Sequence, residues 1–148
     1  MKLRTGLLLL GVCAGALLLS GCAMGFNRDW RAAEKGPGDG IQGRWKGEWL
    51  SEHNGHHGEL KAVVTKTSPT TYRAHYYAKY LKILHYTYVA TLTGQDADTN
   101  GIVHLEGEAK LPKLAGGVYT YKATSTPQKF ESTYNSKYDH GHYEMARP

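Results

Sequence analysis

The chain has 148 residues, with 18 Lys and Arg against 13 Asp and Glu, and a formal net charge of +5 at pH 7. The basic residues are scattered along the sequence, so it lacks the dense Lys/Arg stripe that marks a nucleic-acid groove. Its aromatic residues are 11 Tyr, 3 Trp and only 2 Phe, and a core built on tyrosine must give each buried hydroxyl a hydrogen-bond partner or water.

The N-terminal segment has the order of a secretory signal sequence. Lys2 and Arg4 precede an uncharged apolar run over residues 6–19, and a positive start ahead of such a run is typical of exported proteins. The run is shorter than the roughly 20 apolar residues that a membrane-spanning helix needs. The sequence therefore predicts a signal peptide over residues 1–21 and not a transmembrane helix.

The signal ends in Leu19-Ser20-Gly21-Cys22, which resembles the lipobox of bacterial lipoproteins. The resemblance implies cleavage before Cys22 and lipidation of its sulfur, so that Cys22 anchors the chain in the lipid bilayer. Ala23 stands where an aspartate often retains such proteins at the inner membrane, so the resemblance implies the outer membrane of the cell envelope. Periplasmic and surface-facing orientations both remain open. The alternative is an ordinary signal peptide with an incidental cysteine.

Removal of 21 of the 148 residues leaves 127, a length that suits one domain. Cys13 would leave with the signal and Cys22 would be acylated, so the mature chain has no disulfide available. Residues 22–42 lack apolar periodicity and contain the stretch Gly36-Pro37-Gly38-Asp39-Gly40, which is typical of a linker. We expect a lipidated Cys22 and a flexible tether over 22–42, with a short helix as an option around residues 29–35.

From residue 43 onward the sequence has the apolar and polar alternation of β-strands. The predicted strands cover residues 44–51, 58–67, 71–80, 82–93, 102–111, 118–125, 129–138 and 142–147. Short segments rich in Gly, Pro, Asn and Asp separate them and favour tight turns between antiparallel neighbours. The sequence predicts an all-β domain over 43–148, a single antiparallel up-and-down meander of about eight strands in a closed or nearly closed barrel. A two-sheet β-sandwich is the alternative.

The alternation also predicts which side chains point inward. In the segment 71–80, Tyr72, Ala74 and Tyr76 share one face while Arg73 and His75 share the other. Large and small residues alternate along the inward face, as they do in small tapered barrels. A closed eight-stranded barrel would also remove both exposed strand edges.

The domain opens with Gly43-Arg44-Trp45-Lys46-Gly47-Glu48-Trp49, and this start resembles the Gly-x-Trp opening of lipocalin-like barrels. The resemblance covers the length of the domain and its number of strands. It implies that Trp45 closes one end of the barrel, and that a small hydrophobic or amphipathic ligand binds inside.

Aromatic residues at strand spacing supply the candidate ligand-binding residues. An aromatic wall with hydroxyl groups is common in pockets for small molecules. Four inward-facing positions form the predicted wall: Trp49, Tyr76, Tyr88 and Tyr121. Aromatic residues at this spacing equally form plain core, so a filled interior is the alternative.

Histidines concentrate in two turns, with His53, His56 and His57 in the first and His140 and His142 in the last. Closure of the barrel would bring these turns to the same rim, and neutral imidazole binds zinc, copper and nickel. A metal site is one hypothesis, and solvated turns whose imidazoles stay apart are the other. Residues 96–102 also match the first half of a calcium loop, but its bidentate Glu is missing, and a hairpin turn is the alternative.

Catalytic machinery is not visible in the sequence. It has no Gly-x-Ser-x-Gly elbow, no thiol left free after export, and no pair of carboxylates on the predicted inner faces. We therefore expect a protein that is not an enzyme and needs no cofactor. The leading hypothesis is a binding module for a small hydrophobic or amphipathic ligand. The alternatives are an envelope interaction protein, such as an assembly factor or a hydrolase inhibitor acting through its loops, and metal capture at the histidine turns.

Overall fold

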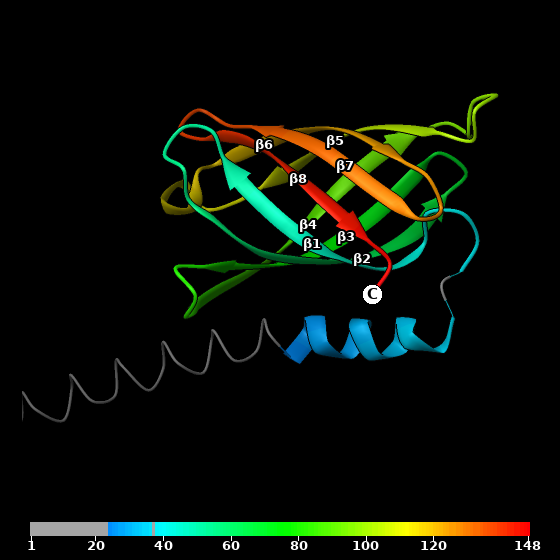
Figure 1. Ribbon diagram of the computed structural model, residues 1–148, viewed down its shortest axis with the longest axis horizontal. Helices are drawn as coiled ribbons and strands as arrows, with labels where there is room; N and C mark the ends of the chain where they lie inside the picture. The colour runs from blue at the N-terminus through cyan, green and yellow to red at the C-terminus, as the bar shows by residue number, and fades with distance from the viewer. Residues whose placement is uncertain (1–23, 37) are drawn as a thin grey trace, which may run out of the picture.

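The computed structural model describes residues 24–36 and 38–148. The predicted signal peptide, its lipobox and Cys22 lie outside the described residues. Eight strands follow in chain order: β1 Gly43–Ser51, β2 His57–Ser68, β3 Thr71–Tyr80, β4 Leu84–Gly94, β5 Val103–Lys110, β6 Val118–Ser125, β7 Lys129–Asn135 and β8 His140–Ala146. Each pairs antiparallel with the next, and β1 also pairs with β8, which closes the barrel (Figure 1). The predicted up-and-down barrel is confirmed, and the two-sheet sandwich is excluded.

Helical structure is short. Residues 24–32 are helical and continue into the 3-10 turn η1, Ala33–Lys35, while η2, Lys113–Ala115, lies in the connection between β5 and β6. Across residues 24–36 and 38–148, we find no helix with the length and apolar character to cross a lipid bilayer.

Register fits large side chains against small ones across the sheet. Trp45 on β1 faces Ala62 on β2, and Leu92 on β4 faces Gly107 on β5, so a large side chain on one strand covers a small residue on its neighbour. Gly47 is small for a different reason. A Cβ at this position would overlap the carbonyl oxygen of Glu144 on β8. The closing pair of strands therefore requires a glycine at this position.

The barrel has two unlike ends. The chain arrives at one of them from residue 42, and the connections β2–β3, β4–β5 and β6–β7 lie there, at the right in Figure 1. The connections β1–β2, β3–β4, β5–β6 and β7–β8 lie at the other, at the left. We call the first the closed end and the second the open end.

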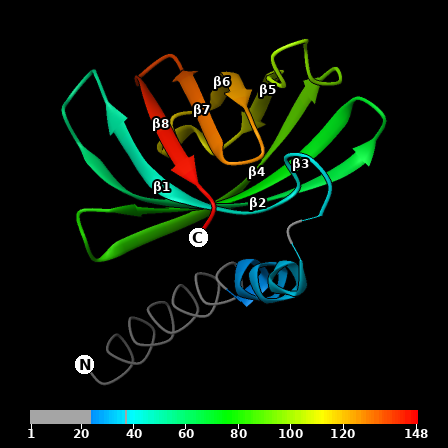
Figure 2. The same cartoon turned by 45° about the vertical axis from the view of Figure 1, so that its right-hand side comes forward.

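The helix over residues 24–32 packs against the outer face of the barrel (Figures 1 and 2). Phe26 is 2% exposed, and its ring packs edge-on against His75 and beside Tyr77 of β3. Asp29 accepts hydrogen bonds from His75 Nδ1 at 2.9 Å and from Arg73 Nη1 at 3.3 Å. The described part of the predicted tether is thus docked, because one buried aromatic ring and one carboxylate find partners on β3.

The helix runs from the open-end side toward the closed end. Phe26 lies beside Tyr77, in the half of β3 nearer the open end, whereas Glu34 pairs at 3.4 Å with Arg44, at the start of β1. Met24, the first described residue, therefore lies on the side of the barrel toward the open end.

Candidate ligand-binding site

The closed end is filled by interlocked side chains. Trp45 is fully buried, donates its Nε1–H to the carbonyl oxygen of Ile41 at 2.9 Å, and meets the ring of Phe130 edge-on at 5.6 Å. The guanidinium of Arg147 lies 3.9 Å from the Trp45 ring centroid and donates to the carbonyl oxygen of Gln42 at 2.7 Å. Trp45 and Arg147 together seal this end, which is the structural role that the Gly-x-Trp resemblance implied for Trp45.

The open end holds a cavity of about 650 Å³. This volume lies in the range that binds one small molecule, and eight-stranded barrels are wide enough to hold one. Eight tyrosines line it: Tyr80, Tyr86, Tyr88, Tyr119, Tyr121, Tyr134, Tyr138 and Tyr143. Apolar side chains complete the wall: Trp49, Leu60, Ala78, Leu84, Leu111, Leu114 and Ala115. The wall is mainly aromatic and aliphatic, with hydroxyl groups set into it.

Charge is nearly absent from the cavity wall. Of the described residues that line it, Asp139 is the only carboxylate and none is Lys or Arg. The Asp139 carboxylate already accepts hydrogen bonds from Ser51 Oγ at 2.6 Å and from the Tyr134 hydroxyl at 3.5 Å. The ring of His85, which also borders the cavity, stacks on Tyr77 at 5.2 Å. The cavity therefore suits an uncharged ligand that is largely apolar.

Tyr76 stands behind the lining residues and supports them. It is fully buried, its hydroxyl lies 2.7 Å from that of Tyr143, and its ring stacks on Tyr88 at 5.0 Å and on Tyr121 at 6.3 Å. Tyr76 thereby supports the rings of the aromatic wall from behind.

Burial keeps the tyrosine hydroxyls protonated. It raises the pKa of Tyr76 well above its usual value, and it raises the pKa of Tyr88, Tyr121 and Tyr134 above the ordinary range as well. The pKa of Tyr143 rises to about 12 for the same reason. At neutral pH these hydroxyls donate and accept hydrogen bonds and do not act as bases.

The barrel wall opens along one seam toward the open end. β4 pairs with β3 along its whole length, from Leu84 to Thr93, but with β5 only from Thr91 to Gly94. Among the described strands, none pairs with the first half of β4 on the β5 side. Lining residues of the cavity come from both sides of this seam, Tyr88 from β4 and Leu111 from beyond β5.

Three of the four predicted wall residues line the cavity. Trp49, Tyr88 and Tyr121 do, and Trp49 is held by its Nε1–H, which donates to the carbonyl oxygen of Lys79 at 2.9 Å. Tyr76 lies one layer behind. Sequence reasoning missed Tyr143, which borders the cavity from β8, although its alternation with Gly141 and Met145 marks it as inward-facing.

The histidine turns come together at the open end without forming a metal site. The rings of His53 and His140 lie 6.1 Å apart, but His56 Nδ1 is 2.7 Å from the Tyr80 hydroxyl and His142 Nδ1 is 2.8 Å from Glu52 Oε1. His57 faces its own turn, with Nδ1 3.4 Å from the carbonyl oxygen of Gly55. No group of three or more His, Cys, Asp or Glu among the described residues is arranged to hold a metal ion.

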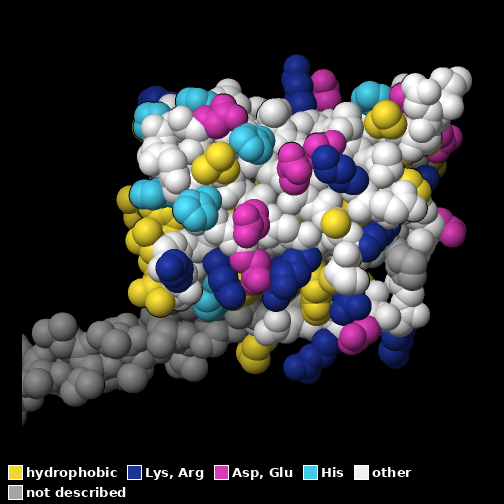
Figure 3. Space-filling model, viewed as in Figure 1, with side chains coloured by type: hydrophobic (Ala, Val, Ile, Leu, Met, Phe, Trp, Pro, Cys, Tyr) yellow, Lys and Arg dark blue, Asp and Glu magenta, His cyan; other side chains and the backbone are white. Residues whose placement is uncertain are grey.

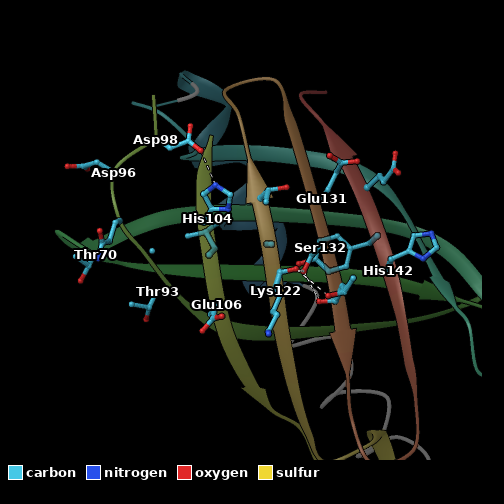
Figure 4. Close-up of a pocket in the computed structure, with 18 residues that line it drawn as sticks. Thr70, Thr93, Asp96, Asp98, His104, Glu106, Lys122, Glu131, Ser132 and His142 are labelled. Carbon is cyan, nitrogen blue, oxygen red and sulfur yellow. Dashed lines mark hydrogen bonds and ion pairs between the residues drawn. The ribbon is translucent and has the colours of Figure 1, made fainter. Parts of the chain in front are cut away.

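A second, wider depression of about 1160 Å³ lies on the outer face, over β5 to β8 (Figure 4). Its charged side chains have both signs, among them Lys122 and Glu131, and the inward-facing Leu105 and Tyr143 also border it. Asp98 at its edge accepts hydrogen bonds from His104 Nε2 at 3.1 Å and from the backbone N–H of Asn100 at 2.8 Å, which is the geometry of a turn and not of a calcium loop. This exposed, charged surface offers an apolar ligand no dry wall, so the open-end cavity is the better candidate site.

Comparisons with known proteins add little to this picture. No protein-family model and no curated protein matches the chain. A solved structure of a fluorescence-activating β-barrel designed de novo is similar over 72% of this chain and 93% of its own, with 13% identity and a TM-score of 0.49. Similarity at this level carries no argument about ligands, so the site rests on its own residues and lipocalin-like membership stays a prediction.

Proposed function

We propose that this protein is a membrane-anchored binding module without catalytic activity, whose open-end cavity holds one small hydrophobic or amphipathic ligand. The observation that carries the proposal is the cavity of about 650 Å³ walled by tyrosine, tryptophan and leucine. Anchoring through acylated Cys22 at the outer membrane is a part of the proposal that rests on the lipobox-like sequence alone.

The wall chemistry narrows the class of ligand. Aromatic faces such as that of Tyr88 favour planar or aliphatic groups, and the neutral hydroxyls of Tyr121 and Tyr143 can pair with an ether, carbonyl or hydroxyl group. The described wall residues include no Lys or Arg to pair with a carboxylate or phosphate, and burial of an unpaired charge is strongly unfavourable. We therefore expect a neutral ligand body, with any charged group left outside at the mouth.

An envelope interaction protein remains the second candidate, but it predicts a filled interior. Aromatic residues around Trp45 and Phe130 fill the closed end of this barrel. A hydrophobic cavity of ligand size at the other end has no use in an interaction through loops alone, so the binding module is the better supported function.

The test is native mass spectrometry of the acyl-free domain purified from its host envelope, combined with titration of the uncharged hydrophobic fluorophore N-phenyl-1-naphthylamine. We expect a small-molecule adduct that survives desalting. We also expect the domain to bind the fluorophore, and the natural ligand to displace it. Ala78→Trp would fill the cavity from β3 and abolish both, because Ala78 belongs to its wall.

Thr124→Trp is the matched control, because it adds the same side chain to the outer-face depression. It should leave adduct and fluorophore binding unchanged. A bare mass with an intact fold and no fluorophore binding would refute the binding module and favour a protein partner, to be sought by crosslinking. Loss of binding in Thr124→Trp but not in Ala78→Trp would move the ligand to the outer face.

A further inference from the structure

Connections at the open end expose large apolar side chains at their tips. Leu114 is 104% exposed and Ile83 is 84% exposed, and the side chains of Leu81, Leu84 and Tyr138 are each more than half exposed. These five residues, which we call the open-end rim, come from three connections that are far apart in sequence and, for Leu84, from the first position of β4. Figure 3 shows hydrophobic side chains gathered at this end of the molecule, at the left. An exposed apolar cluster of this kind marks an interaction surface.

Each of these three connections also places a lysine beside its apolar tip. Lys82 precedes Ile83, Lys113 precedes Leu114, and Lys137 precedes Tyr138. The carboxylates in the open-end connections are already engaged, Glu52 with His142 and Asp139 with Ser51. These two carboxylates keep their charge, but the three lysines outnumber them, so the open-end connections are apolar with a net positive charge.

Two residues of the β3–β4 turn have a backbone conformation that glycine or asparagine would adopt more easily. Leu81 has φ of 50° and Lys82 has φ of 66°, in the left-handed region that L-residues with a Cβ disfavour. Backbone strain of this sort persists where the side chains themselves are needed. The tip of this turn keeps one apolar and one basic side chain despite that strain.

The N-terminal helix brings the expected anchor point to the same end. Phe26 is docked beside Tyr77, and the described chain begins at Met24, on the open-end side. Cys22 is two residues before Met24 in the sequence, and two residues span about 7 Å at most. A lipid attached to Cys22 would therefore enter the bilayer from the open-end side of the barrel.

We infer that the open-end rim docks on the surface of an anionic lipid bilayer, with the mouth of the cavity turned toward the membrane. Apolar side chains flanked by lysines are the combination that binds such surfaces, because the apolar groups enter the headgroup region while the ammonium groups meet lipid phosphates. The inference goes beyond ligand binding, since an acyl chain on Cys22 alone would not orient the barrel. It requires no molecule inside the cavity.

Vesicle flotation of a chain without acyl groups tests the docking. All strand pairs and helix contacts described above lie within residues 24–148, so a chain that begins at residue 22, with Cys22→Ser, keeps the whole fold. We expect it to float with phosphatidylcholine vesicles that contain about one quarter phosphatidylglycerol, and much less with phosphatidylcholine alone, because surface lysines respond to anionic lipid.

Two sets of variants separate the rim from the overall charge. Lys82→Glu, Lys113→Glu and Lys137→Glu together should lower the affinity for anionic vesicles by more than about tenfold, since each lysine near such a surface contributes about fivefold. Ile83→Ser with Leu114→Ser should weaken binding to a similar degree. The control triple Lys35→Glu, Lys66→Glu and Lys122→Glu changes the net charge equally but lies elsewhere, and should retain binding within about twofold.

All substituted rim side chains are exposed, so the variants should keep the unfolding midpoint and near-ultraviolet circular dichroism of the parent chain. Absence of vesicle binding by the parent chain would overturn the inference and leave the rim as a surface for a protein. An equal loss in the control triple would overturn it too, because binding would then depend only on net charge.

Discussion

The two ends of the barrel are built from the same eight strands and the same kinds of residue, yet one is a plug and the other a cavity. At the closed end, Trp45 meets Phe130 edge-on on one side and carries the Arg147 guanidinium on its ring face. At the open end, rings such as those of Tyr88 and Tyr121 stand around an empty volume. Aromatic residues at strand spacing can thus form either a filled core or a cavity wall. Which of the two forms depends on whether other side chains close that end of the barrel.

Closure comes from chain segments outside the strands. Ile41, just before β1, accepts the hydrogen bond from Trp45, and Arg147, just after β8, covers the Trp45 ring. At the open end, side chains from the connections, such as Leu114 and Tyr138, only border the cavity. Small residues there, such as Ala78 and Ala115, leave the volume unfilled.

Alkaline pH is the strongest expected challenge to the open end. Burial raises the pKa of Tyr76, Tyr88, Tyr121, Tyr134 and Tyr143 above the value of about 10 expected in the unfolded chain. Because the folded pKa is the higher one, this contribution to stability is fully present below about pH 10 and is lost as the pH rises further. We expect tyrosinate absorbance at 295 nm to rise in a steep step that coincides with loss of near-ultraviolet circular dichroism.

Tyr138→Phe is the control for this titration, because it removes an exposed hydroxyl at the rim and should leave the cooperative step in place. A gradual rise in absorbance with the circular dichroism intact would show that the cavity tyrosines ionise inside the fold, contrary to the expectation.

Trp45→Ala should produce the next largest effect. Truncation of a fully buried tryptophan costs about 3–5 kcal/mol of unfolding free energy, which urea denaturation measures. N-phenyl-1-naphthylamine binding should persist under conditions where the variant is folded, because Trp45 lies in the plug and not in the cavity wall.

Trp49→Ala provides the matched comparison, since Trp49 lies on the same strand but lines the cavity. It should lose less stability than Trp45→Ala and more fluorophore binding. If the two variants lose equal stability and equal binding, the distinction between plug and cavity is wrong.

The inward-facing residues and the closure of the barrel could be predicted from the sequence. The alternation along Tyr72, Ala74 and Tyr76 gave the inward faces, and the number of strands favoured closure. The pattern predicts that a side chain points inward, but it does not predict how deep along the barrel that side chain lies. Tyr76 is the example, because it points inward as predicted but lies behind the cavity wall.

Other features depend on contacts that leave little trace in the sequence. The helix over residues 24–32 docks through Phe26 and Asp29, two residues that are too few to create a periodic pattern. The open seam arises because β4 extends past the end of its pairing with β5, and unequal strand lengths become visible only once the register is known.

Tyr76→Phe should lower the unfolding free energy by less than Trp45→Ala does. Tyr76 lies between the closed end and the cavity. The substitution removes the hydroxyl that lies 2.7 Å from that of Tyr143, and loss of one neutral hydrogen bond costs about 1 kcal/mol. The double variant with Tyr143→Phe should lose less than the sum of the single variants, because the two hydroxyls share that bond. Strict additivity in urea denaturation would argue against the bond.

Asp29→Ala should have the smallest effect on the stability of the barrel. It should instead weaken the docking of the N-terminal helix, which sets where the anchor lies relative to the barrel. Burial raises the pKa of Asp29, but hydrogen bonds from His75, Arg28 and Arg73 outweigh it and hold this pKa below its usual value of 3.8. The carboxylate therefore stabilises helix docking at and above about pH 4, and this contribution is lost as the pH falls through the lowered pKa. The barrel itself should unfold at an unchanged urea concentration.

Trypsin cleavage after Arg28 and Arg31 reports the docking. Cleavage should be faster in Asp29→Ala than in the parent chain at neutral pH, whereas Glu34→Ala, which breaks only an exposed ion pair with Arg44, should change little. Equal cleavage rates in all three proteins would mean that Phe26 holds the helix without Asp29. If the helix does detach, the stretch between Cys22 and β1 becomes a free tether, and the open-end rim must find the bilayer without the help of an anchor held on its own side.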